Sequence, residues 1–386
     1  MKAKFNNIKI SGLSVVVPEK EINIYDEAQY YDNSVKKIDR MRKMVGFHKR
    51  RVCDDETTPS DLAYDAAKNL LEKMDIDVNS IDILLFVVQK PDYVNPACAY
   101  FLHNKLGLSK NCLAIDINQG CAGWVYGLFI ASQMIESKTA KRILLLNGDT
   151  PSPTIDLSNR TTAPLFGDAG CATLIDYCED NIESYYNIET QSSGFEALID
   201  PYSGTRFRLK IQNNNDFKLM SELREKRYTT PNGVSVSPFS SFMDGMAVFD
   251  FTMNVVPQNI KELLEYSGFT QDDIGALCLH QANKQIVQTV GNAAGFNEEK
   301  VPYSAFENYG NNTMCSIPTT ITILDTNISK EKLLCSGFGN GLVCASALLN
   351  LKNTKILDIK TFEKPSYVKT RDEYIKYWEQ KFKGEV

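Results

Sequence analysis

Cys121 is the side chain of this sequence that is best placed to act as a nucleophile. It stands in Asn-Gln-Gly-Cys-Ala-Gly-Trp at 118–124, between an apolar run at 113–117 and a helix-like run at 124–136. A strand-to-helix junction sets the sulfur at the positive end of a helix dipole, where backbone N–H groups favour thiolate over thiol. Flanking glycines allow a sharp turn or the close approach of a ligand. Most cysteines are nevertheless small buried hydrophobes, so a catalytic and a structural thiol both stay open on these residues alone.

Two polar segments in the second half of the chain could act with this thiol. His280 follows an apolar run at 276–279 and opens the sequence His-Gln-Ala-Asn. The carboxyl end of a strand is where α/β proteins place functional groups, although a histidine there can also be a hydrogen-bonded core residue. The second segment, Tyr-Gly-Asn at 309–311, precedes a helix start. A glycine beside an asparagine at such a place is also typical of a tight turn with a helix cap.

The size and composition of the chain indicate a cytoplasmic protein with more than one domain. The 386 residues exceed the usual size of one domain, and 43% apolar residues suffice for a sizeable core. Ten cysteines are scattered without a Cys-x-x-Cys pair, which is typical of reduced thiols and not of a disulfide framework or a zinc site. The sequence has neither a signal-peptide pattern nor an apolar run of membrane-span length. We therefore expect no metal site and no membrane contact.

The charge of the chain is unevenly distributed. A net charge of −6 argues against general binding of nucleic acid. Between residues 36 and 51, however, eight Lys or Arg residues accompany a single acid, Asp39. In an acidic protein such a patch could meet phosphate or an acidic partner, and a solvated helix face followed by a basic turn explains it equally well.

Apolar runs that alternate with helix-like stretches predict an α/β protein with mostly parallel strand pairing. Phe-Gly followed by a strand of small residues occurs at 166–175 and again at 338–348, which suggests two duplicated halves. The predicted strands are 8–17, 83–88, 113–117, 143–146, 276–279 and 333–335. The predicted helices are 61–74, 96–106, 124–136, 255–267 and 284–294.

Two stretches lie outside this alternation. Residues 201–240 are polar and rich in turn formers, which is typical of a surface insertion or of a cap over a site. In the tail after residue 352, a capping-box pattern at 370–373 begins a helix whose apolar residues follow at helical spacing. We expect this helix to pack on the protein's own surface, with the binding of a partner as the alternative.

Taken together, these motifs resemble the β-ketoacyl-acyl-carrier-protein synthase III family of the thiolase-like fold. Gly-Cys-Ala-Gly corresponds to the nucleophile elbow of the family and His-Gln-Ala-Asn to its histidine motif, while Tyr-Gly-Asn, with Pro318 downstream, corresponds to its asparagine motif. Two further segments agree: Asn-Arg-Thr-Thr at 159–162 leading to Phe-Gly-Asp-Ala-Gly, and Met-Asp-Gly at 243–245 leading to Val-Phe. The resemblance extends from about residue 5 to about residue 351. Five motifs in the family's order are far more specific than any one of them.

The resemblance implies two pseudo-duplicated α/β halves in a layered α-β-α-β-α architecture. Residues 1–180 would form the N-terminal half with the nucleophilic cysteine, and residues 181–351 the C-terminal half with the histidine and the asparagine. Residues 352–386 are an addition to the minimal length of the family and would carry the amphipathic helix.

The resemblance also implies a reaction, the decarboxylative Claisen condensation of an acyl thioester primer with malonyl-acyl-carrier protein. Cys121 would take the acyl group of the primer. After the malonyl group loses CO₂, neutral His280 and Asn311 would donate hydrogen bonds to the enolate oxygen. Backbone N–H groups of Cys121 and of Asn340, in the loop Gly-Phe-Gly-Asn-Gly, would hold the oxyanion that forms when the carbanion attacks the acyl group. The β-ketoacyl-acyl-carrier protein formed could start fatty acid synthesis or serve a dedicated pathway.

The same resemblance suggests the residues that bind the substrates. Coenzyme A or carrier-protein thioesters are the expected substrates, so no resident cofactor is expected, and the family implies a homodimer that works with acyl-carrier protein. The candidates for coenzyme A are Arg42, Arg50, Arg160 and Asn283. The candidates for contact with the carrier protein are Gln281, Lys284 and Gln285.

Four positions depart from the family pattern, and one of them is Gln285, which stands beside Lys284 where an arginine often follows the histidine motif. Arg40 and Met44 stand where the coenzyme A pocket usually has a tryptophan and an arginine. Asn95 stands where a phenylalanine is frequent near the acyl pocket. We therefore do not expect acetyl as the primer, and a carrier protein could be the acyl donor in place of coenzyme A.

Two other functions are compatible with the motifs. An acyltransferase would keep the acyl-cysteine and pass its acyl group to an alcohol or an amine. A non-catalytic partner subunit would shape a complex, but such partners typically lose the cysteine that this chain retains. The retained histidine and asparagine favour decarboxylation over both alternatives.

Overall fold

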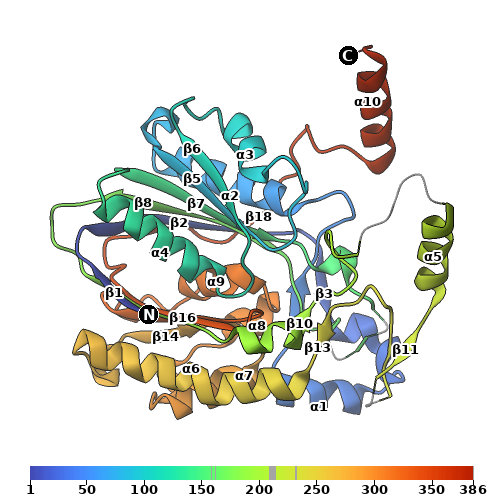
Figure 1. Ribbon diagram of the computed structural model, residues 1–386. Coiled ribbons are helices and arrows are strands. Elements are labelled where there is room, and N and C mark those ends of the chain that lie inside the picture. The colour runs from blue at the N-terminus through green and yellow to red at the C-terminus, as the bar shows by residue number, and fades with distance from the viewer. Residues whose placement is uncertain (158, 161, 208–213, 231–232, 386) are drawn as a thin grey trace.

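A computed structural model describes residues 1–157, 159, 160, 162–207, 214–230 and 233–385. These residues form five layers in the order helices, sheet, helices, sheet, helices (Figure 1). The outer helices on one side are α2 (Pro59–Lys73) and α3 (Cys98–Leu106), and those on the other are α6 (Gly245–Ser267) and α7 (Lys284–Ala293). Helices α4 (Gly123–Glu136) and α9 (Ser316–Thr322) lie between the sheets. The expected α-β-α-β-α architecture is confirmed.

The first sheet combines strands of the N-terminal half with two short strands from the tail. Its order is β17-β2-β8-β7-β5-β6, and β18 pairs with β2 as well. The strands are β2 (Ile8–Val17), β5 (Ile83–Val88), β6 (Leu113–Ile117), β7 (Arg142–Asp149), β8 (Ala169–Tyr177), β17 (Lys355–Ile356) and β18 (Lys360–Thr361). β5 runs parallel to β6 and β7, whereas β8 is antiparallel to both β7 and β2.

The second sheet has the order β1-β9-β16-β15-β14. Its strands are β1 (Lys2–Phe5), β9 (Ser184–Thr190), β14 (Ala276–Leu279), β15 (Leu333–Gly339) and β16 (Val343–Leu349). Only β14 and β15 pair in parallel within it. The expectation of mostly parallel pairing is therefore wrong. β15 and β16 are joined by a turn of three residues, which can return the chain only antiparallel, because a parallel return needs a long crossover.

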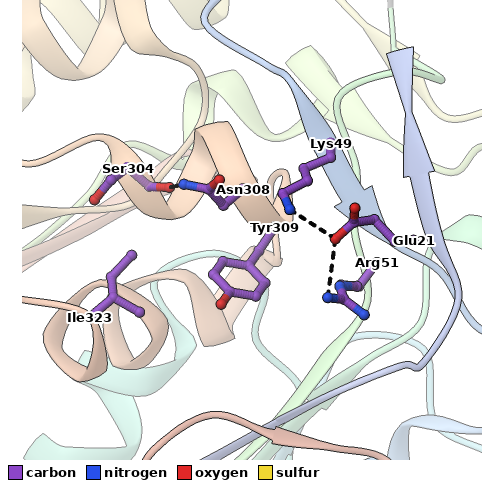
Figure 2. A pocket seen from close by; sticks show the side chains of 7 residues that line it. All are labelled: Glu21, Lys49, Arg51, Ser304, Asn308, Tyr309 and Ile323. Atoms are coloured by element: carbon purple, nitrogen blue, oxygen red, sulfur yellow. Dashed lines mark hydrogen bonds and ion pairs between the residues drawn. The ribbon is translucent and has the colours of Figure 1, made fainter. Parts of the chain in front are cut away.

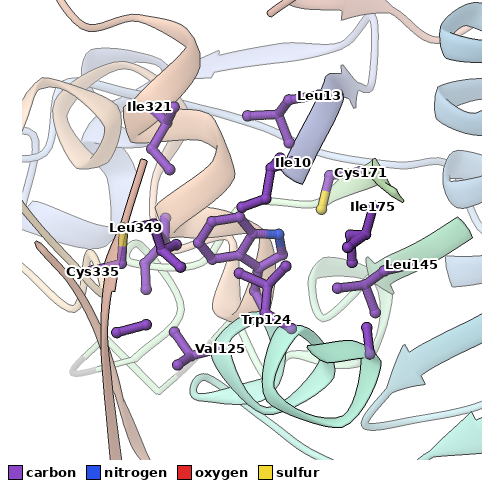
Figure 3. Packing of buried hydrophobic residues seen from close by; sticks show 14 of the residues in the cluster. Ile10, Leu13, Trp124, Val125, Leu145, Cys171, Ile175, Ile321, Cys335 and Leu349 are labelled. Carbon is purple, nitrogen blue, oxygen red and sulfur yellow. The ribbon is translucent and has the colours of Figure 1, made fainter. Parts of the chain in front are cut away.

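The core between the sheets is built around α4. Trp124 at the start of this helix is fully buried, and its indole N–H donates to Thr173 Oγ1 at 3.0 Å (Figure 3). A Cβ on Gly127 would approach Leu145 of β7 to 2.5 Å, so the missing side chain lets the helix lie close to the sheet. An apolar helix that is buried over most of its surface is expected to be rigid, which suits an element that begins two residues after the nucleophile.

A small subdomain formed by residues 21–51 packs against the helix that leads to the asparagine motif. Strands β3 (Glu21–Asn23) and β4 (Lys49–Arg51) pair with each other, and α1 (Val35–Val45) lies between them in the sequence. Helix α8 (Ser304–Tyr309) packs against β4.

Short 3₁₀ helices occur throughout the described residues. They are η1 (Ile24–Tyr31), η2 (Val78–Ser80), η3 (Ser152–Thr154), η4 (Ser192–Ala197), η5 (Gln271–Asp273), η6 (Glu298–Lys300) and η7 (Thr313–Cys315).

The tail packs on the protein's own surface along part of its length. Strands β17 and β18 add to the edge of β2, and the ring of Tyr367 lies between those of Tyr64 and Phe101. The amphipathic helix α10 (Arg371–Lys383) then extends away from the body and buries none of its residues (Figure 1), although Tyr374 in its first turn interacts with the side chain of Tyr93. The expectation that the helix packs on the surface is therefore met only at its first turn, whereas the strands that precede the helix do pack there.

The polar segment 201–240 lies on the surface where the structure describes it; residues 208–213, 231 and 232 fall outside the described residues. It contains α5 (Asn214–Glu225) and the hairpin β11 (Tyr228–Thr229) and β12 (Ser235–Val236), and it is flanked by the pair β10 (Leu198–Ile199) and β13 (Phe242–Met243). Arg227 and the backbone N–H of Ser237 both bind the carboxylate of Asp156, which fastens the segment to the loop before Arg160.

Candidate active site

Cys121 lies in the turn between β6 and α4, as the sequence predicts. The strand end formed by Gly337 and Gly339 of β15 presses against this turn. A Cβ built on Gly337 would come within 2.7 Å of Ala122 Cα, and one on Gly339 would lie 3.0 Å from Cys121 Cβ and 3.2 Å from its Sγ. The thiol therefore faces bare backbone from the opposite half of the molecule.

The electrostatic state of the thiol differs from the expectation. Part of the residue is exposed, yet burial of the sulfur raises the pKa of the Cys121 thiol to about 12, and the charge of Asp149 adds to the rise. The expected stabilisation of the thiolate by the helix terminus is therefore contradicted in the resting protein. Desolvation outweighs a helix dipole, because α4 begins in a buried layer and not at the surface.

Alkylation should reveal this protonated thiol. We expect the rate at which iodoacetamide labels Cys121 to rise about tenfold for each pH unit above neutrality, because the thiolate fraction grows until the pKa of about 12 is reached. Peptide mass spectrometry at a series of pH values measures this rate, with Cys121→Ala as the blank. A plateau near neutral pH would mean that the thiol is already ionised.

Gly339 is expected to tolerate no side chain. In Gly339→Ala the new methyl carbon would stand within van der Waals distance of the sulfur, and displacement of a reacting atom by about 1 Å can cost roughly a hundredfold in rate. Stopped-flow or quenched acylation of the cysteine measures the loss. Gly245→Ala is the matched control, because a Cβ there meets no atom within 4 Å; equal rates for both variants would show that the loop does not bound the thiol.

His280 follows β14 at its carboxyl end and is almost fully buried. Its Nδ1 lies 2.9 Å from Ser316 Oγ, and its ring meets the ring of Phe338 edge-on with centroids 5.5 Å apart. Burial lowers the pKa of His280 to about 4, and the carbonyl of Thr313 offsets only part of this effect. The imidazole is therefore neutral at physiological pH, as its expected role requires.

Asn311 is held in place by the Phe-Gly-Asp-Ala-Gly segment. Its N–H donates to Leu165 O at 2.7 Å, and its carbonyl accepts the N–H of Gly167 at 3.2 Å. Its side-chain Oδ1 accepts the N–H of Thr313 at 2.9 Å. Because the N–H of Thr313 already donates to Oδ1, the NH₂ group of the amide points away from Thr313. This orientation is the one that a hydrogen bond from Asn311 to an enolate oxygen needs.

A chain of contacts joins the three candidate residues. Cys121 touches Gly339, the neighbouring Phe338 touches His280, and His280 reaches Asn311 through Ser316 and Thr313. The structure thus brings the three motifs to one place between the halves, although they are far apart in sequence.

Asp149 is a member of this neighbourhood that the sequence analysis missed. It ends β7, is buried, and interacts with the side chain of Thr313. Burial raises the pKa of Asp149 to about 6. The signal that could have found it is an acid at the carboxyl end of an apolar strand, the same position that singled out His280.

Two arginines of the coenzyme A prediction, Arg50 and Arg160, are already paired within the protein. Arg50 is buried, and its two terminal nitrogens donate to Glu27 at 2.8 and 2.7 Å. Arg160 lies 3.6 Å from the same carboxylate, donates to Tyr31 Oη at 3.1 Å, and stacks on the ring of Tyr30 with 4.3 Å to the centroid. Arg50 therefore has no free face for a phosphate, whereas Arg160, which is partly exposed, keeps its predicted role as a prediction.

The last turn of α1 in the basic patch and two of the carrier-protein candidates, Lys284 and Gln285, form one surface. The C-terminal Gly46 of α1 packs against the side chain of Lys284 at the start of α7. Arg42 in the last turn of α1 donates to Tyr25 Oη at 3.0 Å, and Gln285 is exposed. Arg42, Lys284 and Gln285 thus lie close together and are available to an acidic partner.

The other two candidates of the histidine motif are occupied by the fold. Gln281 is fully buried; its amide NH₂ donates to the carbonyls of Leu279 and Pro302, and its Oε1 accepts the N–H of Phe306. Asn283 caps α7, because its Oδ1 accepts the N–H of Ile286 at 2.8 Å. Contact of Gln281 with a carrier protein is contradicted by its burial, and the coenzyme A role of Asn283 stays a prediction.

Asn340 stands in the turn between β15 and β16, and its side chain lies against Gly120, where Gln89 also approaches. Two amide groups therefore border the residue before the nucleophile. This polar wall was not expected, since only the backbone of Asn340 was assigned a role.

A separate cavity lies on the other side of the asparagine motif. It has a volume of about 320 Å³ and opens between α8 and the β3–β4 hairpin (Figure 2). The carboxylate of Glu21 binds both Lys49 and Arg51 at 3.1 Å in its wall. Cys121, His280 and Asn311 are not among the described residues that line it, so this cavity is not the site of the thiol.

Comparison with known proteins identifies the family. Family models of 3-oxoacyl-[acyl-carrier-protein] synthase III match residues 115–194, and those of its C-terminal part match residues 264–351. The chain is 38% identical over 369 residues to a putative 3-oxoacyl-[acyl-carrier-protein] synthase 3 of Campylobacter jejuni, covering 94% of this chain and all of that protein. It is 30% identical to the β-ketoacyl-[acyl-carrier-protein] synthase III of Streptococcus sanguinis, covering 90% of this chain and all of that protein.

Solved structures agree with these matches. The crystal structure of a 3-oxoacyl-(acyl-carrier protein) synthase from Burkholderia xenovorans superimposes with a TM-score of 0.82 at 33% identity, covering 94% of this chain and 99% of that one. Among the described residues, no helix is both long and apolar enough to span a membrane. On these matches, the chain belongs to the β-ketoacyl-acyl-carrier-protein synthase III family of condensing enzymes and has its thiolase-like fold.

Proposed function

We propose that the protein condenses an acyl thioester primer with malonyl-acyl-carrier protein by way of an acyl-Cys121 intermediate. The observation that carries the proposal is the pair of donors that Phe338 and Gly339 of β15 connect to the thiol. The amide of Asn311 is turned outward by the N–H of Thr313, and His280 is kept neutral by burial. Two neutral donors suit an enolate oxygen, whose charge appears only during decarboxylation.

The first half-reaction forms the acyl-enzyme. The sulfur of Cys121 attacks the thioester carbonyl, the bond to the donor sulfur breaks, and the donor leaves as a thiol with the proton that Cys121 gave up. Backbone N–H groups of Cys121 and Asn340 would stabilise the tetrahedral oxyanion, in keeping with the close approach of β15 to the thiol.

The second half-reaction makes the new carbon–carbon bond. The malonyl carboxylate leaves as CO₂, and the electron pair of the broken bond becomes the enolate held by His280 and Asn311. The carbanion attacks the acyl carbonyl, the carbon–sulfur bond breaks, and the sulfur of Cys121 leaves as a thiolate that takes a proton from solvent. The product is a β-ketoacyl-acyl-carrier protein.

The acyl donor is the part of the proposal that the site constrains least. Arg50 is paired with Glu27 and is not available to a phosphate. Arg40 and Met44, which replace the usual residues of the coenzyme A pocket, are both exposed on α1. The surface formed by Arg42, Lys284 and Gln285 suits an acidic carrier protein. We therefore propose carrier protein as the partner in the second half-reaction and test both donors in the first.

Intact-protein mass spectrometry tests the proposal. The protein is incubated with a panel of acyl-coenzyme A and acyl-carrier-protein donors, and malonyl-carrier protein is added second. The expected result is a mass gain on Cys121 that disappears with release of CO₂ and a β-ketoacyl product. An adduct that malonyl donor leaves unchanged but an alcohol or amine removes would favour acyl transfer, and no adduct from any donor would favour a non-catalytic subunit.

We also propose a homodimer joined at β6. This strand ends its sheet, its sequence Leu-Ala-Ile-Asp-Ile is rich in strand formers, and half of the Leu113 surface is exposed. An apolar edge strand is a template for pairing with a second chain. Light scattering should give about twice the chain mass of 43.4 kDa, and Leu113→Lys should shift the population toward the monomer. A wild-type monomer at micromolar concentration would contradict this pairing.

A further inference from the structure

Thr313 has an unusual backbone conformation for its residue type. Its φ is +49°, in the left-handed region, where a β-branched residue is a genuine outlier. The residue is buried and is the first residue of η7, the turn that precedes α9. Strained residues of this kind persist where the surrounding structure holds them, and they cluster at functional sites.

The two backbone groups of Thr313 are directed at the two expected donors. Its N–H donates to Asn311 Oδ1 at 2.9 Å. Its carbonyl lies 2.8 Å from Ser316 Oγ, and the same Oγ lies 2.9 Å from His280 Nδ1. When neutral His280 carries its donor proton on Nε2, its Nδ1 is an acceptor, so the single hydroxyl proton of Ser316 is shared between this nitrogen and the Thr313 carbonyl. One peptide unit therefore fixes the amide of Asn311 directly and the ring of His280 through a single hydroxyl.

The side chain of Thr313 anchors this unit on a third side. Its Oγ1 donates to the carbonyl of Asn312 at 2.8 Å, and it interacts with the buried carboxylate of Asp149 at the end of β7. Asp149 belongs to the first half of the chain, whereas His280 and Asn311 belong to the second. Thr313 thus connects the donor pair to the sheet that leads to the nucleophile.

We propose that Thr313 is a positioning residue for the condensation, and that its left-handed backbone sets the separation of the His280 and Asn311 donors. This rests on the function proposed above. An enolate oxygen gains from two donors only when both lie within hydrogen-bond distance of one point. In the right-handed helical conformation, the N–H and carbonyl of Thr313 would lie along the following helix and could not hold both side chains.

The test compares Thr313→Gly with Thr313→Ser. Glycine adopts the left-handed conformation without strain, but it also allows the backbone to leave it and removes the anchor to Asp149. We expect Thr313→Gly to keep acylation of Cys121 within about twofold while malonyl decarboxylation falls about a hundredfold, the scale of losing an oxyanion donor. Thr313→Ser keeps the hydroxyl and should recover most of the rate.

A matched control separates positioning from general stability. Lys138 also has a positive φ, of 60°, but lies on the surface beyond α4. Lys138→Gly should leave both half-reactions unchanged. If Thr313→Gly lowers acylation and decarboxylation equally, or lowers neither, Thr313 does not position the donors and the proposal is overturned.

A spectroscopic measurement keeps this test independent of the proposed reaction. ¹⁵N NMR of the imidazoles, with His280→Asn to assign the signal, should show one fixed tautomer for His280 in the wild type and an averaged or broadened signal in Thr313→Gly. An unchanged signal overturns the proposal even where no decarboxylation is found. A wild type without decarboxylation but with the expected change in the signal refutes the condensation alone.

Discussion

Replacement of Cys121 by alanine is expected to abolish acylation and turnover while leaving the fold intact. The sulfur is the only atom in the site that could carry the acyl group in the proposed route, and removal of the nucleophile from a covalent mechanism costs on the order of a millionfold. The side chain itself contributes little to packing, because its neighbour across the site is the bare backbone of Gly339. The measurement is intact mass after incubation with the reactive donor, together with the rate of product release.

Cys178→Ala is the control for this experiment. Cys178 is half-buried like Cys121, but it lies just beyond β8 at the far end of the sheet. Its variant should acylate at the wild-type rate. Turnover that survives in Cys121→Ala, or acylation that is lost in Cys178→Ala, would refute the assignment of the nucleophile.

Replacement of His280 or Asn311 by alanine is expected to separate the two half-reactions. Each variant should still form the acyl-enzyme, because the oxyanion groups that we propose for the first step are the backbone N–H groups of Cys121 and Asn340. Decarboxylation of the malonyl donor should fall roughly a hundred- to a thousandfold in each, the usual loss for one such donor. Release of ¹⁴CO₂ from labelled malonyl-carrier protein measures the second step alone.

The double variant sharpens this prediction. Groups that act on one oxygen are expected to be non-additive, so His280→Ala with Asn311→Ala should lose less than the product of the single losses. Loss of acylation in His280→Ala would mean instead that the imidazole takes the proton of Cys121, whose thiol pKa is about 12. In that case the role of His280 would have to be reassigned to the first half-reaction.

The three motifs could be predicted from sequence because each carries its own local signal. Cys121 sits at a strand-to-helix turn, His280 at a strand end and Asn311 at a glycine turn, and neighbours within a few residues create each of these features. The alternation of apolar runs and helix-like stretches predicted only an α/β protein, whereas the layered architecture was implied by the resemblance to the family. The contribution of the fold is to bring these three turns, which are far apart in sequence, into contact with one another.

The protonation state of the Cys121 thiol and the ion pairing of Arg50 with Glu27 could not be predicted in the same way. The pKa of Cys121 depends on how deeply the turn is buried and on Asp149, which comes from another strand. Arg50 lies in a run of basic residues that suggests a phosphate site, yet its partner Glu27 reaches it only after the chain has folded back through α1. Gln281 was misread for the same reason, because its partners Pro302 and Phe306 come from the following loop.

The pairing of the tail with β2 has a consequence for how the chain is made. Thr354 Oγ1 donates to the carbonyl of Ile10, so partners on this edge are separated by 344 residues. At a ribosomal elongation rate of about 5–20 residues per second, the edge of β2 waits roughly 20 to 70 s for β17 and β18 to be synthesised. During that time a long, apolar strand is open to other nascent chains.

Non-local pairing of this kind also slows folding, because a large loop must close before the contacts form. Strands β17 and β18 therefore complete the first sheet only after nearly the whole chain has been synthesised. A version that stops before residue 355 would leave β2 permanently at the edge. We expect it to collect in inclusion bodies, so that the tail governs the yield of folded enzyme as well as the shape of its surface.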